Sequence, residues 1–103
     1  MAKAVKVATA SELPPGDMKT FDVEGKLILV ANVDGVYYAM DAICSHEEWD
    51  LSEGMLEDTR VTCAGHGAVW DLRTGTAEFD EELPPLKTYK TLLKDGEVFI
   101  EIE

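Results

Sequence analysis

All the cysteines and histidines of this chain lie in two short stretches. Cys44 and His46 are separated by one residue, and Cys63 and His66 by two, and these are the two cysteines and two histidines among 103 residues. Thiolates and imidazoles bind soft and borderline metal ions, and four such donors complete a tetrahedral ligand set. The sequence therefore predicts a metal centre whose ligands are Cys44, His46, Cys63 and His66.

The order of the donors bears on which metal is bound. Zinc sites of mixed ligation tend to pair cysteine with cysteine and histidine with histidine, whereas here each stretch contributes one of each, with residues 47–62 between them. A structural zinc ion nevertheless uses the same donor types and remains an alternative. A disulfide between Cys44 and Cys63 is a second alternative, but it leaves both histidines unexplained.

The residues around the donors resemble the Rieske proteins, in which two histidines replace two cysteines on one iron of a [2Fe-2S] cluster. Residues 44–54 are similar to the family pattern C-[ST]-H followed by L-x-x-G. Residues 63–75 are similar to C-P-x-H-G-x-x-[FWY]-D-x-x-[TS]-G, with Ala64 where the family usually has proline. Losing that proline frees the unfolded loop, at a cost of about 0.4–1 kcal/mol, and removes no ligand.

The resemblance implies one [2Fe-2S] cluster per chain, bound by Cys44, His46, Cys63 and His66. It predicts a soluble electron-transfer protein that carries one electron between a reductase and a terminal acceptor such as an oxygenase. The chain is not expected to be an enzyme, because its two histidines are both assigned to the cluster and none remains for a mononuclear iron site. A zinc-stabilised binding module and a redox-sensing small subunit are the alternative functions.

Two positions near the second stretch indicate a low reduction potential. High-potential Rieske proteins carry a serine and a tyrosine that donate hydroxyl hydrogen bonds to cluster sulfurs, and the corresponding residues here are Ala68 and Trp70. Neither has a hydroxyl group, so we expect a potential near the lower end of the Rieske range, about −150 mV. We expect Trp70 to pack beside the cluster. For Trp49, simple packing and partner docking both remain open.

The hydrophobic pattern predicts an all-β fold. No stretch of ten or more residues has a helical apolar period, and residues 47–52 can form at most one helical turn. Residues 26–33 are nearly continuously apolar, which is typical of a strand buried on both faces. Asp34 and Gly35 are a hairpin signal. The predicted strands are residues 4–8, 18–23, 26–33, 36–41, 55–57, 60–63, 69–71, 76–79, 86–94 and 97–102.

The length indicates one domain, residues 1–103. By resemblance it is a Rieske-like antiparallel β-sandwich or barrel base with a small inserted cluster-binding subdomain, approximately residues 42–85. The proline-rich residues 83–86 are either a third loop over the cluster or an ordinary turn.

The net charge of −12 opposes binding to nucleic acid or anionic membranes and favours redox partners with a basic surface. No apolar run approaches the roughly 20 residues of a membrane-spanning helix, and the first ten residues have no signal-peptide core. With both cysteines assigned as ligands, a reducing cytoplasm is expected. The acidic residues near the two stretches are Glu47, Glu48, Asp50, Glu53, Glu57, Asp58, Glu78, Asp80, Glu81 and Glu82.

Overall fold

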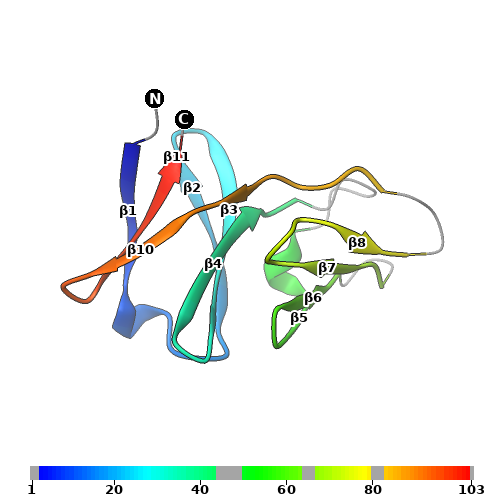
Figure 1. The fold of residues 1–103 in the computed structure, drawn as a ribbon, viewed down its shortest axis with the longest axis horizontal. Helices are drawn as coiled ribbons and strands as arrows, with labels where there is room; N and C mark the ends of the chain where they lie inside the picture. The colour runs from blue at the N-terminus through cyan, green and yellow to red at the C-terminus, as the bar shows by residue number, and fades with distance from the viewer. Residues whose placement is uncertain (1–2, 44–49, 64–66, 80–82, 103) are drawn as a thin grey trace.

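The computed structural model describes residues 3–43, 50–63, 67–79 and 83–102. Within these ranges, strands form three antiparallel sheets, and the two helical segments are single 3-10 turns (Figure 1). The all-β prediction is confirmed. The elements are β1 (Lys3–Thr9), η1 (Ala10–Glu12), β2 (Met18–Val23), β3 (Lys26–Val33), β4 (Val36–Asp41), η2 (Leu51–Glu53), β5 (Met55–Glu57), β6 (Arg60–Thr62), β7 (Val69–Asp71), β8 (Ala77–Glu78), β9 (Thr88–Tyr89), β10 (Thr91–Lys94) and β11 (Glu97–Ile102).

Two of the sheets form a sandwich that is the base of the molecule. One has the strand order β1-β11-β10 and the other β2-β3-β4-β9. Alternating apolar residues of both sheets meet in a shared core, as expected for sheets that each bury one face against the other. This base core contains Leu13, Val23, Ile28, Val30, Tyr37, Ala39, Tyr89, Val98, Ile100 and Ile102.

Strand β3 belongs to two cores at once. Ile28 and Val30 point into the base core, while Leu29 and Ala31 point into a second core on the opposite face of the sheet. All four side chains are 0% exposed. The predicted burial of this strand on both faces is therefore confirmed. The second core lies between this sheet and the third sheet, of order β5-β6-β7-β8 (Figure 1).

The single strand predicted for residues 86–94 is wrong. The structure has β9, which pairs with β4, and β10, which pairs with β11, so the chain changes sheets at Lys90. The Tyr89 hydroxyl donates a hydrogen bond of 2.6 Å to the carboxylate of Asp41 on β4, in the β2-β3-β4-β9 sheet. The carbonyl of the next residue, Lys90, accepts a backbone hydrogen bond of 2.9 Å from Glu101 on β11, in the β1-β11-β10 sheet. A strand-like sequence pattern does not reveal such a change of partner.

The predicted hairpin turn at Asp34 and Gly35 is confirmed by its backbone angles. Asp34 and Gly35 have φ values of 53° and 91°, and a two-residue turn with two positive φ angles matches the right-handed twist of the flanking strands. The remaining predicted strands are found with ends within one residue of those expected.

Side-chain hydrogen bonds stabilise the start of each of the two helical turns. At η1, the Thr9 amide and hydroxyl donate to the Glu12 carboxylate at 3.1 and 2.9 Å, a capping pair that the sequence analysis did not identify. The structure has a helical turn at η2 (Leu51–Glu53), which overlaps the range considered for one, residues 47–52, only at its last two residues. Residues 47–49 of that prediction lie outside the described residues.

Candidate metal centre

Paired backbone closes the first predicted ligand loop at its base. Ile43 and Asp50, the residues on either side of positions 44–49, form an antiparallel bridge, and the Leu51 amide donates a hydrogen bond of 2.7 Å to the Ala42 carbonyl. The loop therefore leaves and rejoins the folded structure at one point. The predicted ligands Cys44 and His46, together with Trp49, lie outside the described residues.

The second predicted ligand loop is closed in the same way. Cys63 directly follows β6, and its amide donates a hydrogen bond of 2.8 Å to the Ala68 carbonyl, which extends the pairing of β6 with β7. The Gly67 amide donates to the Cys63 carbonyl at 3.0 Å, and Gly67 has a φ of 81°, a conformation that favours glycine. Ala64 and the predicted ligand His66 lie outside the described residues.

The bases of the two loops share one buried core. Cys63, the predicted ligand that the structure describes, is 2% exposed within it. Ala42 and Leu51, at the base of the first loop, belong to the same hydrophobic core. So do residues of the sheet next to Cys63. The structure thus brings together the bases of two loops that are far apart in the sequence. The members near the loop bases are Ala42, Leu51, Val61, Cys63, Ala68 and Trp70.

Asp50 connects the first loop to the base of the molecule. Its carboxylate accepts hydrogen bonds from the Thr20 hydroxyl on β2 at 2.6 Å and from the amide and hydroxyl of Ser52 at 2.9 and 2.8 Å. Partial burial acts to raise the pKa of Asp50, but the three hydrogen bonds outweigh it, and the pKa is lowered below its ordinary value. The sequence analysis missed this role, although Asp50 before a helical turn is an N-cap signal.

A glycine allows the first loop stem to approach the second. A side chain at Gly54 would overlap the Thr62 carbonyl oxygen, and Thr62 directly precedes Cys63. Three residues earlier, the Leu51 side chain is 0% exposed in the second core. The L-x-x-G pattern therefore has a structural reason, because the leucine anchors η2 and the glycine permits close contact between the two stems.

The Asp71 to Gly75 segment forms a turn after β7. The Asp71 carboxylate accepts hydrogen bonds from the side chain and the amide of Arg73, and these lower the pKa of Asp71. The Gly75 amide donates to the Asp71 carbonyl at 2.8 Å. Gly75 has a φ of 77°, and a side chain there would overlap the Leu86 carbonyl oxygen.

The proline-rich segment is fastened to the same turn. The Leu86 amide donates a hydrogen bond of 2.8 Å to the Gly75 carbonyl. Leu83 and Leu86 pack against the second core, while Pro84 and Pro85 are exposed. The segment is therefore anchored beside the core that contains Cys63. Its predicted role as a cover over the cluster stays a prediction.

The described residues fit a Rieske-type cluster. Such a cluster takes two thiolates and two imidazoles, which is the donor set of the two loops, and Cys63 stands at the end of a closed, buried stem. Trp70 supplies a second observation, because its indole Nε1 is buried and has no hydrogen-bond partner among the described residues. Sulfur atoms are acceptors that could satisfy such a donor.

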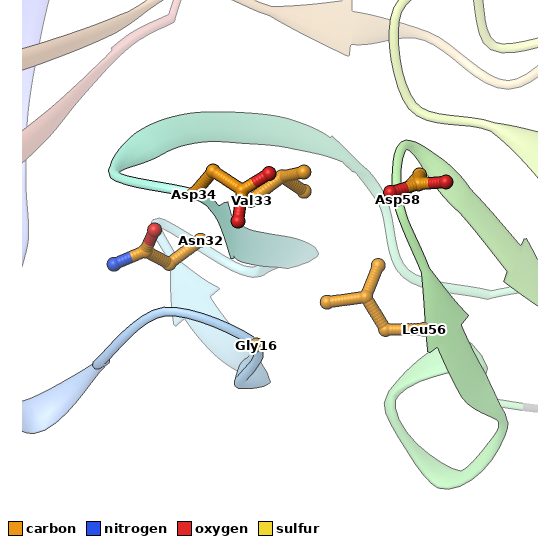
Figure 2. A pocket seen from close by; sticks show the side chains of 6 residues that line it. All are labelled: Gly16, Asn32, Val33, Asp34, Leu56 and Asp58. Atoms are coloured by element: carbon orange, nitrogen blue, oxygen red, sulfur yellow. The ribbon is translucent and has the colours of Figure 1, made fainter.

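A separate cavity lies away from the loop bases. It has a volume of about 100 Å³, is open to solvent on one side, and is lined by the turn between β3 and β4, the turn between β5 and β6, and Gly16. Figure 2 shows the Asp34 and Asp58 side chains on the two turns that flank it. Asp58 precedes β6 and Cys63 follows it, so the cavity and the loop bases lie at opposite ends of this strand.

The protein is a β-sandwich base that carries a small third sheet, and the bases of two closed loops meet on one buried core. Residues 3–90 match the Rieske [2Fe-2S] domain. The chain belongs to this family, and its cofactor is one [2Fe-2S] cluster. Within the part of the chain that the structure describes, no helix has the length and apolar character needed to cross a membrane.

Similar proteins include ferredoxin components of dioxygenase systems. The ferredoxin component of biphenyl 2,3-dioxygenase from Rhodococcus jostii is 39% identical over 98 residues, which are 95% of this chain and 92% of that protein. The 3-phenylpropionate/cinnamic acid dioxygenase ferredoxin subunit from Photorhabdus laumondii is 39% identical over 97 residues, with 93% and 91% covered.

A solved structure of similar fold is the ferredoxin of carbazole 1,9a-dioxygenase from Nocardioides aromaticivorans. Its TM-score is 0.89 at 29% identity, covering 95% of this chain and 96% of that one. A ferredoxin solved in complex with the reduced oxygenase of carbazole 1,9a-dioxygenase has a TM-score of 0.87 at 30% identity, with 94% and 91% covered.

Proposed function

We propose that this protein is an electron carrier that takes one electron from a reductase and delivers it to a terminal acceptor such as an oxygenase. The observation that carries the proposal is the convergence of the two loop stems on one buried core. The relatives support the assignment, because they are ferredoxin components of dioxygenase systems. One similar ferredoxin was solved together with an oxygenase, which supports the same choice of acceptor.

The proposed ligands are the thiolates of Cys44 and Cys63 on one iron and the imidazoles of His46 and His66 on the other. When bound, the cluster accepts and releases one electron. The proposed organisation is a single Rieske domain, residues 1–103, with a cluster-binding subdomain at approximately 42–85. The separate β5-β6-β7-β8 sheet, which lies between β4 and β9 in the sequence, supports this division.

The protein's own residues hold the loops in place for this task. The Ile43 and Asp50 bridge closes one loop, and the hydrogen bonds between Cys63, Gly67 and Ala68 close the other. The buried core beneath Cys63 excludes water from that thiol. Closed stems on a packed core fix the ends of both loops, and the proposed ligand Cys63 stands at one of these ends.

The carrier is proposed to have no catalytic activity of its own and to work in the cytoplasm. Both of its histidines are assigned to the cluster, which leaves none for a second iron site. Both cysteines are assigned as well, so no disulfide that would need an oxidising compartment is required. The partners are proposed to be redox proteins with a basic surface, because the chain carries a net charge of −12.

Metal and sulfide analysis tests the proposal. The purified protein should contain two iron atoms and two acid-labile sulfides per chain, have visible absorption, and take up one electron per chain in a reductive titration. A colourless protein with one zinc ion and no sulfide would contradict the proposal in favour of a zinc-stabilised module. Mixing the reduced protein with an oxygenase and its substrate should give product, whereas the carrier alone should give none.

A further inference from the structure

We propose that the indole N–H of Trp70 donates a hydrogen bond to a sulfur atom of the bound cluster and thereby stabilises its reduced form. This inference rests on the cluster site proposed above. Trp70 is 0% exposed, and its Nε1 has no hydrogen-bond partner among the described residues. An indole nitrogen is a donor only, so the missing partner must be an acceptor.

An orphaned N–H group of this kind is costly. A buried donor without a partner loses about 1–3 kcal/mol relative to its hydrated state, and roughly 90% or more of buried polar groups in folded proteins are satisfied. The core around Trp70 offers few alternatives. Apart from the sulfur atoms of Met40 and Cys63, the buried side chains of this core contain no acceptor.

The strand register places Trp70 and Cys63 on the same face of the sheet. Val61 pairs with Trp70, and the Cys63 amide donates to the Ala68 carbonyl, so Cys63 stands opposite Ala68. Because alternate residues of a strand point to the same face, Val61 and Cys63 on one strand and Ala68 and Trp70 on the next share one face. All four are buried, with exposures from 0% to 2%.

Trp70 is therefore a diagonal cross-strand neighbour of Cys63. Such neighbours are about 7–8 Å apart, within reach of large aromatic side chains. A cluster bound through the Cys63 thiolate brings sulfur atoms to the face on which the indole lies. The same cluster thus supplies acceptors near the donor that the described residues leave unsatisfied.

The hydrogen bond predicts a direction for the redox equilibrium. The reduced cluster carries one more negative charge than the oxidised cluster, so a donor to its sulfur stabilises the reduced form more strongly. Removing the donor should lower the equilibrium constant for reduction about five- to tenfold, which corresponds to roughly 40–60 mV for one electron. Trp70 would contact the cluster directly and adjust its reduction potential.

Trp70→Phe tests the inference, since phenylalanine keeps an aromatic ring and removes the N–H group. Leu72→Ala is the packing control, because Leu72 lies in the same core, is 1% exposed, and has no donor to lose. With equal iron and sulfide content in all three proteins, Trp70→Phe should lower the midpoint potential and Leu72→Ala should leave it nearly unchanged. Equal potentials in the wild type and Trp70→Phe, or equal shifts in both variants, would overturn the inference.

If Trp70→Phe fails to hold the cluster, a spectroscopic measurement on protein that keeps Trp70 still tests the inference. Protein labelled with ¹⁵N in the indole ring, and carrying Trp49→Phe so that Trp70 is the only tryptophan, is reduced and examined by pulsed electron paramagnetic resonance. A resolved coupling of the cluster spin to the indole ¹⁵N and its proton is expected. No coupling in a fully loaded sample would overturn the inference, whereas a wild-type protein without iron and sulfide would overturn the proposed function itself.

Discussion

The Thr20 hydroxyl donates a hydrogen bond of 2.6 Å to the Asp50 carboxylate. Thr20 lies on β2 of the base, and Asp50 is the residue at which the first ligand loop rejoins the fold. The same carboxylate oxygen also accepts from Ser52 and caps η2. This hydrogen bond therefore ties the position of the candidate metal centre to the sandwich that supports it.

Thr20→Val should lower the free energy of unfolding by about 1–2 kcal/mol, because the hydrogen bond goes to a charged acceptor. Thr88→Val is a suitable control, since Thr88 is an exposed strand residue. Denaturant unfolding of both variants and the wild type measures the difference. Equal stability of Thr20→Val and Thr88→Val would contradict the predicted role of the hydrogen bond.

The Asp50 interaction should also depend on pH. The pKa of Asp50 in the folded protein is lowered, so its contribution is complete above the ordinary aspartate pKa of about 3.9. That contribution is lost as the pH falls through the folded pKa. The difference in unfolding free energy between the wild type and Asp50→Asn should therefore shrink in acid. A difference that is constant from pH 7 down to pH 2 would be incompatible with this linkage.

Substituting each proposed ligand in turn should show which of the four residues bind the cluster. Cys44→Ser and Cys63→Ser should abolish the cluster, because a hydroxyl group is a poor replacement for a thiolate. His46→Ala and His66→Ala should lose the cluster or leave a labile one. Iron content and visible absorption measure the result. Any variant that keeps the full visible spectrum would remove its residue from the ligand set.

Gly75→Ala should be more destabilising than Gly96→Ala. Both glycines have a φ of 77°, so each alanine pays a similar backbone cost of about 1–2 kcal/mol. At Gly75 the new methyl group would also overlap the Leu86 carbonyl oxygen, whereas Gly96 has open space around it. Thermal unfolding should rank the wild type above Gly96→Ala, and Gly96→Ala above Gly75→Ala. Equal melting temperatures for the two variants would show that the proline-rich segment shifts to make room for the methyl group without loss of stability.

Electron transfer to a basic partner should slow as salt concentration rises, since the Debye length falls from about 10 Å at 0.1 M to about 3 Å at 1 M. The structure indicates which acidic residues should contribute most to attracting the basic partner. Glu53 is exposed and lies next to Gly54, whose backbone contacts Thr62 beside Cys63, whereas Asp58 lies at the far end of β6. Glu53→Gln should therefore reduce the low-salt rate more than Asp58→Asn. Rates that do not change with salt would rule out electrostatic steering by this surface.

The midpoint potential should lie near the lower end of the Rieske range, about −150 mV. Ala68 and Trp70 are both buried in the core that contains Cys63. Neither has a hydroxyl group, and the indole of Trp70 has a single N–H, so these two positions offer at most one donor where high-potential members have two hydroxyl donors. The net charge of −12 acts in the same direction, because it opposes the addition of an electron. Protein-film or mediated electrochemistry at pH 7 measures the value. A midpoint well above 0 mV would contradict membership of the low-potential class.

Local chemistry and residue periodicity were enough to predict much of this protein. The choice of donors depends only on residue type, because thiolate and imidazole are the groups that bind such metals. The continuous apolar run in β3 and the Asp34 and Gly35 turn are local patterns, and a local pattern reports burial and backbone angles directly.

The tertiary structure decided which partner each of these residues meets. The pattern of β3 predicts two buried faces, but only the fold assigns Ile28 to the base core and Leu29 to the core beneath the loops. Likewise, the strand-like residues 86–94 are divided at Lys90 between two sheets. Thr20 donates a hydrogen bond to Asp50, which lies thirty residues away in the sequence. Periodicity encodes whether a side chain is buried, whereas its neighbours depend on how distant strands pack, which no local pattern contains.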